Sequence, residues 1–304
     1  MSIREAALTL QRSASNIQLR LARGVAHVLA EAYSRSDRRP WRLGYSQFRA
    51  RYLAHLLADR GFLGGLRDGA PLPDGHGVRL DARTVEIPWV LAHLDAEART
   101  LLDAGSSLNF ESVIRSAPLT GKSLVVTTLA PERRCYWHLG VSYVFGDLRR
   151  TIFDSERFDA VACISTIEHV GMDNTRYGDQ SNSEQAEAPG DFTAALRELR
   201  RVLRSGRPLY VTFPFGRYRN HGWFQQFDAA LADRLIETFG PSRMKECVFR
   251  YTASGWVRST RAECADCDFF DVTKSRYFDS TSTLDFPPDY PAGERAVMCL
   301  ELIK

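Results

Sequence analysis

Residues 158–169 read FDAVACISTIEH, and this stretch decides the fold. Its first part is a nearly continuous run of apolar residues, as expected for a parallel strand that is buried on both faces. The run ends at Ser165, and Glu168 and His169 follow side by side. Ligands bind beyond the carboxyl ends of the strands in an open parallel sheet. The stretch therefore predicts a buried strand that leads directly into a functional site.

Short apolar runs of the same kind recur on both sides of this stretch, at 100–103, 123–129, 141–145 and 208–213. A helix is predicted over residues 191–203, where Leu196, Leu199, Val202 and Leu203 form the apolar stripe, and Ser205–Gly206 ends it. Two further runs, at 247–252 and 296–303, complete the pattern. Alternating strands and helices predict an α/β fold with a doubly wound, mostly parallel sheet of about seven strands.

Residues 1–80 form a predicted helical extension, and residues 81–304 form the predicted sheet domain. The glycine- and proline-rich residues 61–77 predict a loop at the boundary. Arginines on the outer helix faces either meet solvent or touch an anionic membrane surface. Apolar residues recur at helical spacing in two stripes, which are Ile17, Leu21, Val25, Val28 and Leu29, and then Tyr52, Leu53, Leu56 and Leu57.

Composition excludes several classes of protein. Apolar residues make up 44% of the 304 residues, as in ordinary globular chains, and the net charge of +3 is too small to indicate nucleic-acid binding. No apolar stretch is long enough to span a bilayer, so a cytoplasmic protein with reduced cysteines is expected. Cys264 and Cys267 form the only CxxC, and no other ligands accompany them, so no metal site is predicted.

The ends of the first and third strands carry further candidate residues. Gly105 permits a tight turn with close backbone approach, and Asn109 is placed to cap the next helix. The turn lacks the GxGxxG fingerprint, which disfavours a nicotinamide cofactor. Asp147 either lies in a ligand crevice or caps the turn that follows it. If the first and fourth strands are neighbours, Gly105 faces Glu168 and His169 across one crevice.

Three motifs in order resemble class I S-adenosylmethionine-dependent methyltransferases. They are LLDAGS at 101–106, FDAVACISTIEHV at 158–170 and ALRELRRVLRSGRPLYVTFPFG at 195–216. The resemblance covers roughly residues 98–216 and implies a Rossmann-like sheet with S-adenosyl-L-methionine as the cofactor. More narrowly, IEHVGMDNTRYGD at 167–179 resembles bacterial methyltransferase-like proteins of surface-polysaccharide loci.

The resemblance implies a role for each matching position. Asp103 would orient the amino group of the cofactor, and Asp147 with Leu148 would contact the adenine. Ser165 and Thr166 would line the sulfonium side. The residues that would pass beneath the methionine part are Ala104, Gly105 and Ser106.

This sequence departs from the family pattern at two places. Ser107 and Asn109 replace the later glycines of the first motif. The acid that usually holds the ribose hydroxyls is missing, and Thr127 and Thr128 stand there, with Glu132 somewhat later. Threonine hydroxyls bind more weakly than a carboxylate, so loss of the cofactor site is an open alternative.

Histidine and carboxylate side chains near the fourth strand suit proton transfer. His169 is the candidate general base with Glu168 to orient it, and His221 is the reserve base. Alternatively, His169 caps the following turn or packs beneath the cofactor, and Glu168 pairs with an arginine of the crevice wall. Residues 86–90, EIPWV, are interpreted as a lid in which Trp89 covers the crevice. Candidate acceptor contacts in the loops after the fourth and fifth strands are Asp173, Asn174, Arg176, Tyr177, Arg217 and Trp223.

Together these features predict a methyltransferase that modifies a hydroxyl of a sugar or glycan-linked acceptor. Methylation of another small metabolite is the second enzymatic reading. A non-catalytic scaffold that kept the fold but lost the cofactor is the alternative from a different class. The sequence leaves the oligomeric state open.

Overall fold

The computed structural model describes residues 24–132, 134–175 and 192–304. Its centre is a mixed sheet with the strand order β3-β2-β1-β4-β5-β10-β8-β9. The first five strands are parallel, and β10 enters antiparallel between β5 and β8. The strands are β1 (Thr100–Ala104), β2 (Ser123–Thr128), β3 (Ser142–Phe145), β4 (Ala160–Ile164), β5 (Pro208–Pro214), β8 (Arg243–Thr252), β9 (Gly255–Ser259) and β10 (Ala296–Ile303).

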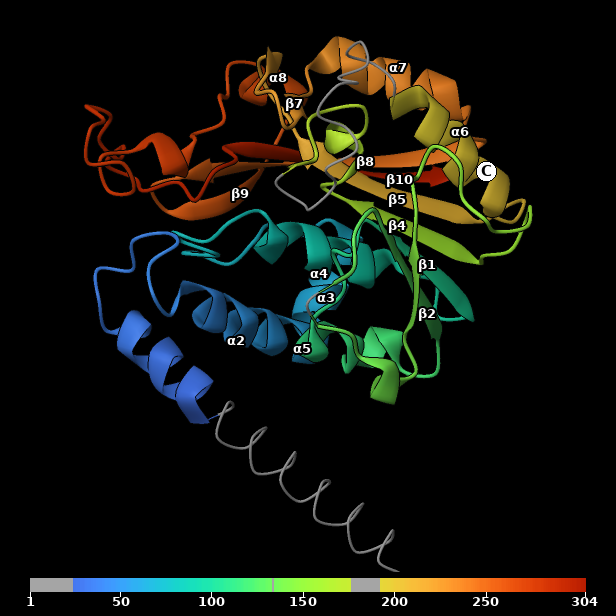
Figure 1. Ribbon diagram of the computed structural model, residues 1–304, viewed down its shortest axis with the longest axis horizontal. Helices are drawn as coiled ribbons and strands as arrows, with labels where there is room; N and C mark the ends of the chain where they lie inside the picture. The colour runs from blue at the N-terminus through green and yellow to red at the C-terminus, as the bar shows by residue number, and fades with distance from the viewer. Residues whose placement is uncertain (1–23, 133, 176–191) are drawn as a thin grey trace, which may run out of the picture.

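Helices cover both faces of the sheet (Figure 1). One face carries α2 (Tyr45–Ala58), α3 (Arg60–Asp68), α4 (Arg83–His93) and α5 (Glu111–Ile114), and the other carries α6 (Phe192–Val202) and α7 (Ala229–Phe239). Two apolar clusters fill the spaces between sheet and helices, so β1, β4 and β5 are buried on both sides. This explains why their sequences are continuously apolar rather than alternating. The α/β fold expected from the sequence is confirmed.

Short elements complete the described chain. They are the 3₁₀ turns η1 (Ala117–Leu119), η2 (Trp137–Leu139), η3 (Ile167–His169) and η6 (Val272–Lys274), the two-stranded ribbon β6 (Arg219–Asn220) and β7 (Gln225–Gln226), and the helix α8 (Arg261–Cys264). Residues 24–34 are also helical.

The strand positions agree with the sequence-based expectations, with one addition. The sheet has eight strands, because β9 pairs antiparallel with β8 at its edge. Tight turn residues separate β8 from β9, and Gly255 adopts a positive φ of 96° there. The predicted helix ends at Val202, earlier than expected, because Leu203 forms a parallel bridge with Phe158.

The predicted loop over residues 61–77 is wrong in its first half, where α3 forms. The side chain of Asp59 accepts a hydrogen bond from the Phe62 N–H and caps the helix, and Gly69 ends it in a left-handed conformation. Leu63 and Leu66 are buried against the sheet core. The burial of this apolar face outweighs the low helix propensity of its glycines.

The predicted lid over residues 86–90 is also wrong. These residues lie in the middle of α4, and Trp89 is 1% exposed. Its ring packs edge-on against Tyr210 of β5, with the centroids 6.4 Å apart. Trp89 therefore belongs to the core and does not cover the crevice.

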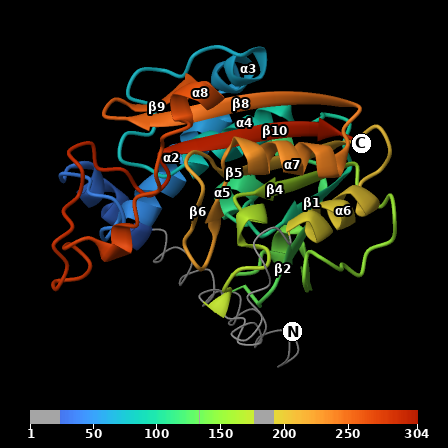
Figure 2. The ribbon, with the colours of Figure 1, turned by 90° about the horizontal axis from the view of Figure 1, so that it is seen from above.

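The segment before α2 lies beside the segment between α8 and β10 at one end of the molecule (Figures 1 and 2). The Trp41 Nε1–H donates to the Ala292 carbonyl oxygen at 2.6 Å, and the Arg39 guanidinium lies over the Tyr290 ring at 5.9 Å. Two parts of the chain that are distant in sequence thus form one wall beyond the sheet.

The N-terminal region is described from residue 24 onward, so Ile17 and Leu21 lie outside the described residues. Val25 and Val28 are exposed, whereas Leu53, Leu56 and Leu57 are buried as the second stripe predicts. The division at residue 80 stays a prediction. None of the helices in the described ranges is long and apolar enough to cross a membrane. All six cysteines are free thiols.

Candidate active site

The strand order reverses between β1 and β4. These two strands are parallel neighbours, with Asp103 opposite Ala162, whereas β2 and β3 lie on the far side of β1. A reversal of this kind opens a crevice beyond the carboxyl ends of the strands, where doubly wound proteins bind ligands. The sequence analysis expected Gly105 and Glu168–His169 to share a crevice only if the first and fourth strands are neighbours. These strands are neighbours in the structure.

The turns after β1 and β4 are in direct contact. Gly105 has a φ of +113°, and a Cβ placed on it would lie 2.0 Å from Oγ1 of Thr166. The hydroxyl of Ser107 donates to the Ile164 carbonyl oxygen at 2.6 Å. Only glycine fits at position 105, because both the backbone conformation and the approach of Thr166 exclude a side chain.

Asp103 supports this turn from behind. Its carboxylate is fully buried and accepts hydrogen bonds from the backbone N–H groups of Ser107 and Leu108 at 3.1 and 2.8 Å. Burial raises the pKa of Asp103 to about 7. The expected helix cap at Asn109 is wrong, because its side chain instead bonds Tyr143 and the Arg134 carbonyl oxygen.

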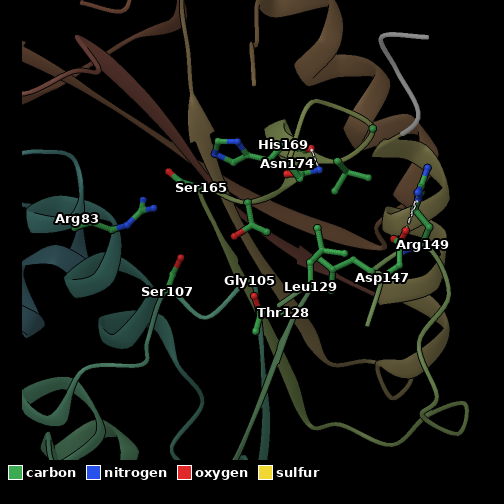
Figure 3. Close-up of a pocket in the computed structure, with 14 residues that line it drawn as sticks. Arg83, Gly105, Ser107, Thr128, Leu129, Asp147, Arg149, Ser165, His169 and Asn174 are labelled. Carbon is green, nitrogen blue, oxygen red and sulfur yellow. Dashed lines mark hydrogen bonds and ion pairs between the residues drawn. The ribbon is translucent and has the colours of Figure 1, made fainter. Parts of the chain in front are cut away.

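The first cavity runs from the β1 and β4 turns toward the end of β3 (Figure 3). Arg83 lies at one end and the pair Asp147–Arg149 lies at the other. The cofactor candidates that line it are Gly105, Thr128, Asp147, Leu148, Ser165 and Thr166. The candidates that do not line it are Asp103, Ala104, Ser106 and Thr127.

Asp147 combines the two readings that the sequence left open. It lines the first cavity, and its Oδ1 also accepts from the Arg149 backbone N–H at 2.8 Å. Its Oδ2 accepts from Nη2 of Arg149 at 2.7 Å. Beside it, no acid follows β2 into the cavity among the described residues, and Thr128 with Leu129 lines that position.

A buried hydrogen-bond network that the sequence reasoning missed connects α4 to the site. Oε1 of Glu86 accepts from the hydroxyls of Ser165 and Thr212 at 2.5 and 2.6 Å, and Oε2 pairs with Arg83 at 2.6 Å. Ser165 has a φ of +38°, an uncommon conformation for a residue with a side chain. The sequence signal was an arginine and a glutamate three residues apart in an otherwise apolar helix.

A second cavity adjoins the first and shares Arg83, Ser165 and His169 with it. Its volume is about 400 Å³, against about 180 Å³ for the first. Several chain segments build its walls, and their lining residues include Trp41 and Arg49, Asp81 and Arg83, Glu168 and His169, Trp223 and Phe224, and Phe269 with Glu294.

His169 stands at the junction of the two cavities. Its Nδ1 lies 2.8 Å from the Trp223 carbonyl oxygen, which only accepts, so Nδ1 carries the proton. In the neutral ring, Nε2 then carries the lone pair, and it lies 3.8 Å from Oε1 of Glu168. The ring also stacks on Trp223 at 5.2 Å. This geometry presents a basic nitrogen on the side of Glu168.

Glu168 is 1% exposed, and its Oε2 has no hydrogen-bond partner. Burial raises its pKa well above the ordinary range, and the nearby Glu86 carboxylate adds to the effect. Glu168 lines the second cavity only. His221, the reserve base, lines neither cavity but stacks on Phe224 at 4.4 Å, and burial lowers its pKa.

The acceptor candidates divide in the structure. Asn174 lines the first cavity and Trp223 the second. Asp173 is exposed and caps its own turn, and Arg217 pairs with Asp266 at the surface. Within the described ranges, no cluster of histidine, cysteine, aspartate or glutamate side chains suits a metal ion. The candidates Arg176 and Tyr177 lie outside the described residues.

No protein-family model matches this chain. No curated protein matches it either. The solved structures to which it is similar include a putative methyltransferase from Bacillus halodurans, with 14% identity over 69% of this chain and 94% of that one and a TM-score of 0.39.

Two further matches cover more of the chain. One is a Thermotoga maritima S-adenosylmethionine-dependent methyltransferase, possibly a histamine N-methyltransferase, with 14% identity, coverage of 84% and 99%, and a TM-score of 0.41. The other is the Burkholderia thailandensis 1,6-didemethyltoxoflavin-N1-methyltransferase with S-adenosylhomocysteine, with 14% identity, coverage of 84% and 90%, and a TM-score of 0.42. At these values the matches carry no information about the acceptor of this chain.

Proposed function

We propose that this protein is an S-adenosylmethionine-dependent methyltransferase that methylates a hydroxyl group of a sugar or glycan-linked acceptor. One observation carries the proposal. Two adjoining cavities meet at His169 and Ser165, beyond the carboxyl ends of β1 and β4. One cavity is assigned to the methyl donor and the other to the acceptor.

The residues of the first cavity fit S-adenosylmethionine. Gly105 lines this cavity with its bare backbone, and no side chain at this position takes up space in the cavity. At one end, the Arg83 guanidinium offers donors for the carboxylate of the methionine part. At the other, Leu148 offers an apolar contact and Asp147 an acceptor for the adenine amine. Thr128 lines the cavity after β2, where the resemblance would place the ribose acid.

S-adenosylmethionine supplies an electrophilic methyl group on a sulfonium when it is bound. The residues of the chain then have to align the acceptor hydroxyl with that methyl group and to remove the hydroxyl proton. The Nδ1–H bond to the Trp223 carbonyl oxygen fixes the His169 ring. Nε2 of His169 therefore takes the proton in this proposal.

Calorimetry with S-adenosylmethionine and S-adenosylhomocysteine tests the donor assignment. Micromolar binding of either compound is expected. The absence of binding at millimolar concentration contradicts the proposal and favours the scaffold alternative. Two observations favour that alternative. The Asp147 carboxylate already bonds Arg149, and among the residues that the structure describes no acid follows β2 into the cavity.

Mass spectrometry of surface glycans tests the acceptor assignment. Cells with and without the gene are compared, and loss of one methylene mass from a sugar residue is expected without it. If the glycans are unchanged but the protein still binds the cofactor, the sugar acceptor is contradicted and the methyl donor assignment is not. Methylation of another small metabolite is then the remaining reading.

A further inference from the structure

The second cavity contains more carboxyl groups than its arginines neutralise. Arg49 pairs with Asp81, and Arg83 pairs with Glu86. Asp271 accepts from the N–H and hydroxyl of Thr273 and lies 3.5 Å from the Lys274 ammonium. Glu168 and Glu294 remain, and among the described residues no lysine or arginine nitrogen lies within ion-pairing distance of either carboxyl group.

These two carboxyl groups are held in an unfavourable environment. Burial raises the pKa of Glu168 well above its usual range and that of Glu294 to about 7. Oε2 of Glu168 is buried without any partner, although buried oxygen atoms nearly always have one. The charged and titratable groups around the pair are Asp81, Arg49, Arg83, Glu86, His169 and Asp271.

Aromatic rings also line this cavity. Trp223, Phe224, Phe269 and Phe278 line it, and Phe278 is 46% exposed. Phe224 and Phe269 meet edge to face at 4.8 Å, which keeps the wall closely packed. A cavity lined by both carboxyl groups and aromatic rings suits an organic cation, because the rings attract positive charge and the carboxylates accept its hydrogen bonds.

We propose that the second cavity selects an acceptor that carries a protonated amino group, and that this group lies between the carboxyl groups of Glu168 and Glu294. The assignment of this ligand as the methyl acceptor rests on the proposed function. An ammonium group has three donors, enough to bond one carboxyl oxygen of Glu168 and one of Glu294 together. An amino sugar combines such a group with hydroxyls that can face His169.

Binding of the cation is coupled to proton release. In the empty cavity, burial favours the protonated forms of Glu168 and Glu294. The ammonium group stabilises the two carboxylates, so each carboxylic acid that ionises on binding gives its O–H proton to the solvent. A neutral sugar in the same place has no charge to stabilise the two carboxylates, so Glu168 and Glu294 keep their protons.

The test compares D-glucosamine, N-acetyl-D-glucosamine and D-glucose as probes by calorimetry at about pH 6, where the amine is charged. D-glucosamine is expected to bind at least tenfold more tightly than the two neutral sugars. Measurement in buffers of different ionisation enthalpy is expected to show proton release for D-glucosamine alone. Equal affinities, or binding without proton release, overturn the proposal.

Variants locate the effect. The double variant Glu168→Gln/Glu294→Gln is expected to reduce the preference for D-glucosamine below twofold and to abolish proton release. The single variant Glu294→Gln, at a partly exposed position, serves if the double variant does not fold, and it too must lose most of the preference. Glu237→Gln removes an exposed acid of α7 as the control and must keep both effects. An unchanged preference in Glu294→Gln overturns the proposal.

S-adenosylhomocysteine is titrated into the same protein. Cation preference without S-adenosylhomocysteine binding contradicts the methyltransferase assignment and leaves the cation site standing. Binding of S-adenosylhomocysteine without cation preference contradicts the cation site and leaves the methyltransferase assignment standing. The two failures are therefore distinguishable.

Discussion

At the scale of single residues, Gly105 is the position where the two loops of the site constrain each other. Gly105→Ala is expected to abolish S-adenosylhomocysteine binding, because the new Cβ would collide with Thr166 and push the β1 and β4 turns apart. Calorimetry measures the loss. Gly121→Ala is the matched control, since Gly121 also has a positive φ, of 77°, but open space around it. Equal loss in both variants would assign the effect to backbone strain alone.

His169→Ala separates catalysis from cofactor binding. Turnover is expected to fall roughly 10²-fold or more, since a positioned general base is lost. Affinity for S-adenosylhomocysteine is expected to stay nearly unchanged, because Arg83, Asp147 and Leu148 supply the proposed cofactor contacts, whereas His169 lies where the two cavities meet. Transfer of labelled methyl groups into extracts of cells that lack the gene provides the assay. Unaltered turnover in His169→Ala would show that His169 is not the general base.

Asp103→Asn tests the buried acid behind the turn. The folded state raises the pKa of Asp103 from 3.8 to about 7, so it binds more protons than the unfolded state in this interval. Stability from this group therefore falls as the pH rises from about 4 to 7, by at most about 4 kcal/mol. Denaturation curves of both proteins across this range give the difference. A constant difference between wild type and variant would contradict the raised pKa.

At the scale of elements, α4 illustrates how one helix serves both core and site. Its central residues, including Trp89, are buried in the core, while Arg83 near its start lines both cavities and Glu86 accepts a hydrogen bond from the Ser165 hydroxyl. The apolar side of the helix fixes its position, and this position brings the Arg83–Glu86 pair to Ser165. A packing element thereby supplies charged groups to the site.

Trp89→Ala distinguishes this arrangement from a lid. A core tryptophan costs about 3–5 kcal/mol of unfolding free energy when truncated, whereas a surface lid residue costs little. Chemical denaturation measures the change. Trp137→Ala is the control at a 60% exposed tryptophan and is expected to cost less than about 1 kcal/mol. A small effect at Trp89 would restore the lid interpretation.

At the scale of the whole molecule, the N-terminal helices and the sheet share one apolar cluster. Leu53, Leu57 and Leu63 belong to the same cluster as Leu101 of β1 and Tyr210 of β5. Trp41 and Arg49 from this region also line the second cavity. The region thus contributes both to the core and to the proposed acceptor site.

A chain that begins at residue 81 is therefore expected to aggregate or to lose its cooperative unfolding, because the apolar surface beneath α2 and α3 is exposed. Size-exclusion chromatography and thermal unfolding monitored by circular dichroism measure this. A chain that begins at residue 24 is the control and keeps every described contact. A soluble, cooperatively folded 81–304 fragment would support the predicted domain division instead.

Much of the sheet was predictable because burial on both faces leaves a local signature. The β1, β4 and β5 sequences are continuously apolar, and their turn residues follow directly in the chain. The strand β9 and the helix α3 were not predictable in this way. Their stability comes from pairing and packing with distant residues, which overrides weak local propensity.

The sequence by itself determined that β1 and β4 end in Gly105 and in the Ser165–His169 segment, since each motif is local. Only the tertiary structure decided that Arg83, Glu86, Trp41 and Glu294 join them. Their side chains come from segments up to about 250 residues apart, and local sequence periodicity does not predict contacts between such distant segments. The physical reason is that a cavity is formed by the packing of whole elements, whereas a strand is formed by its own residues and their neighbours.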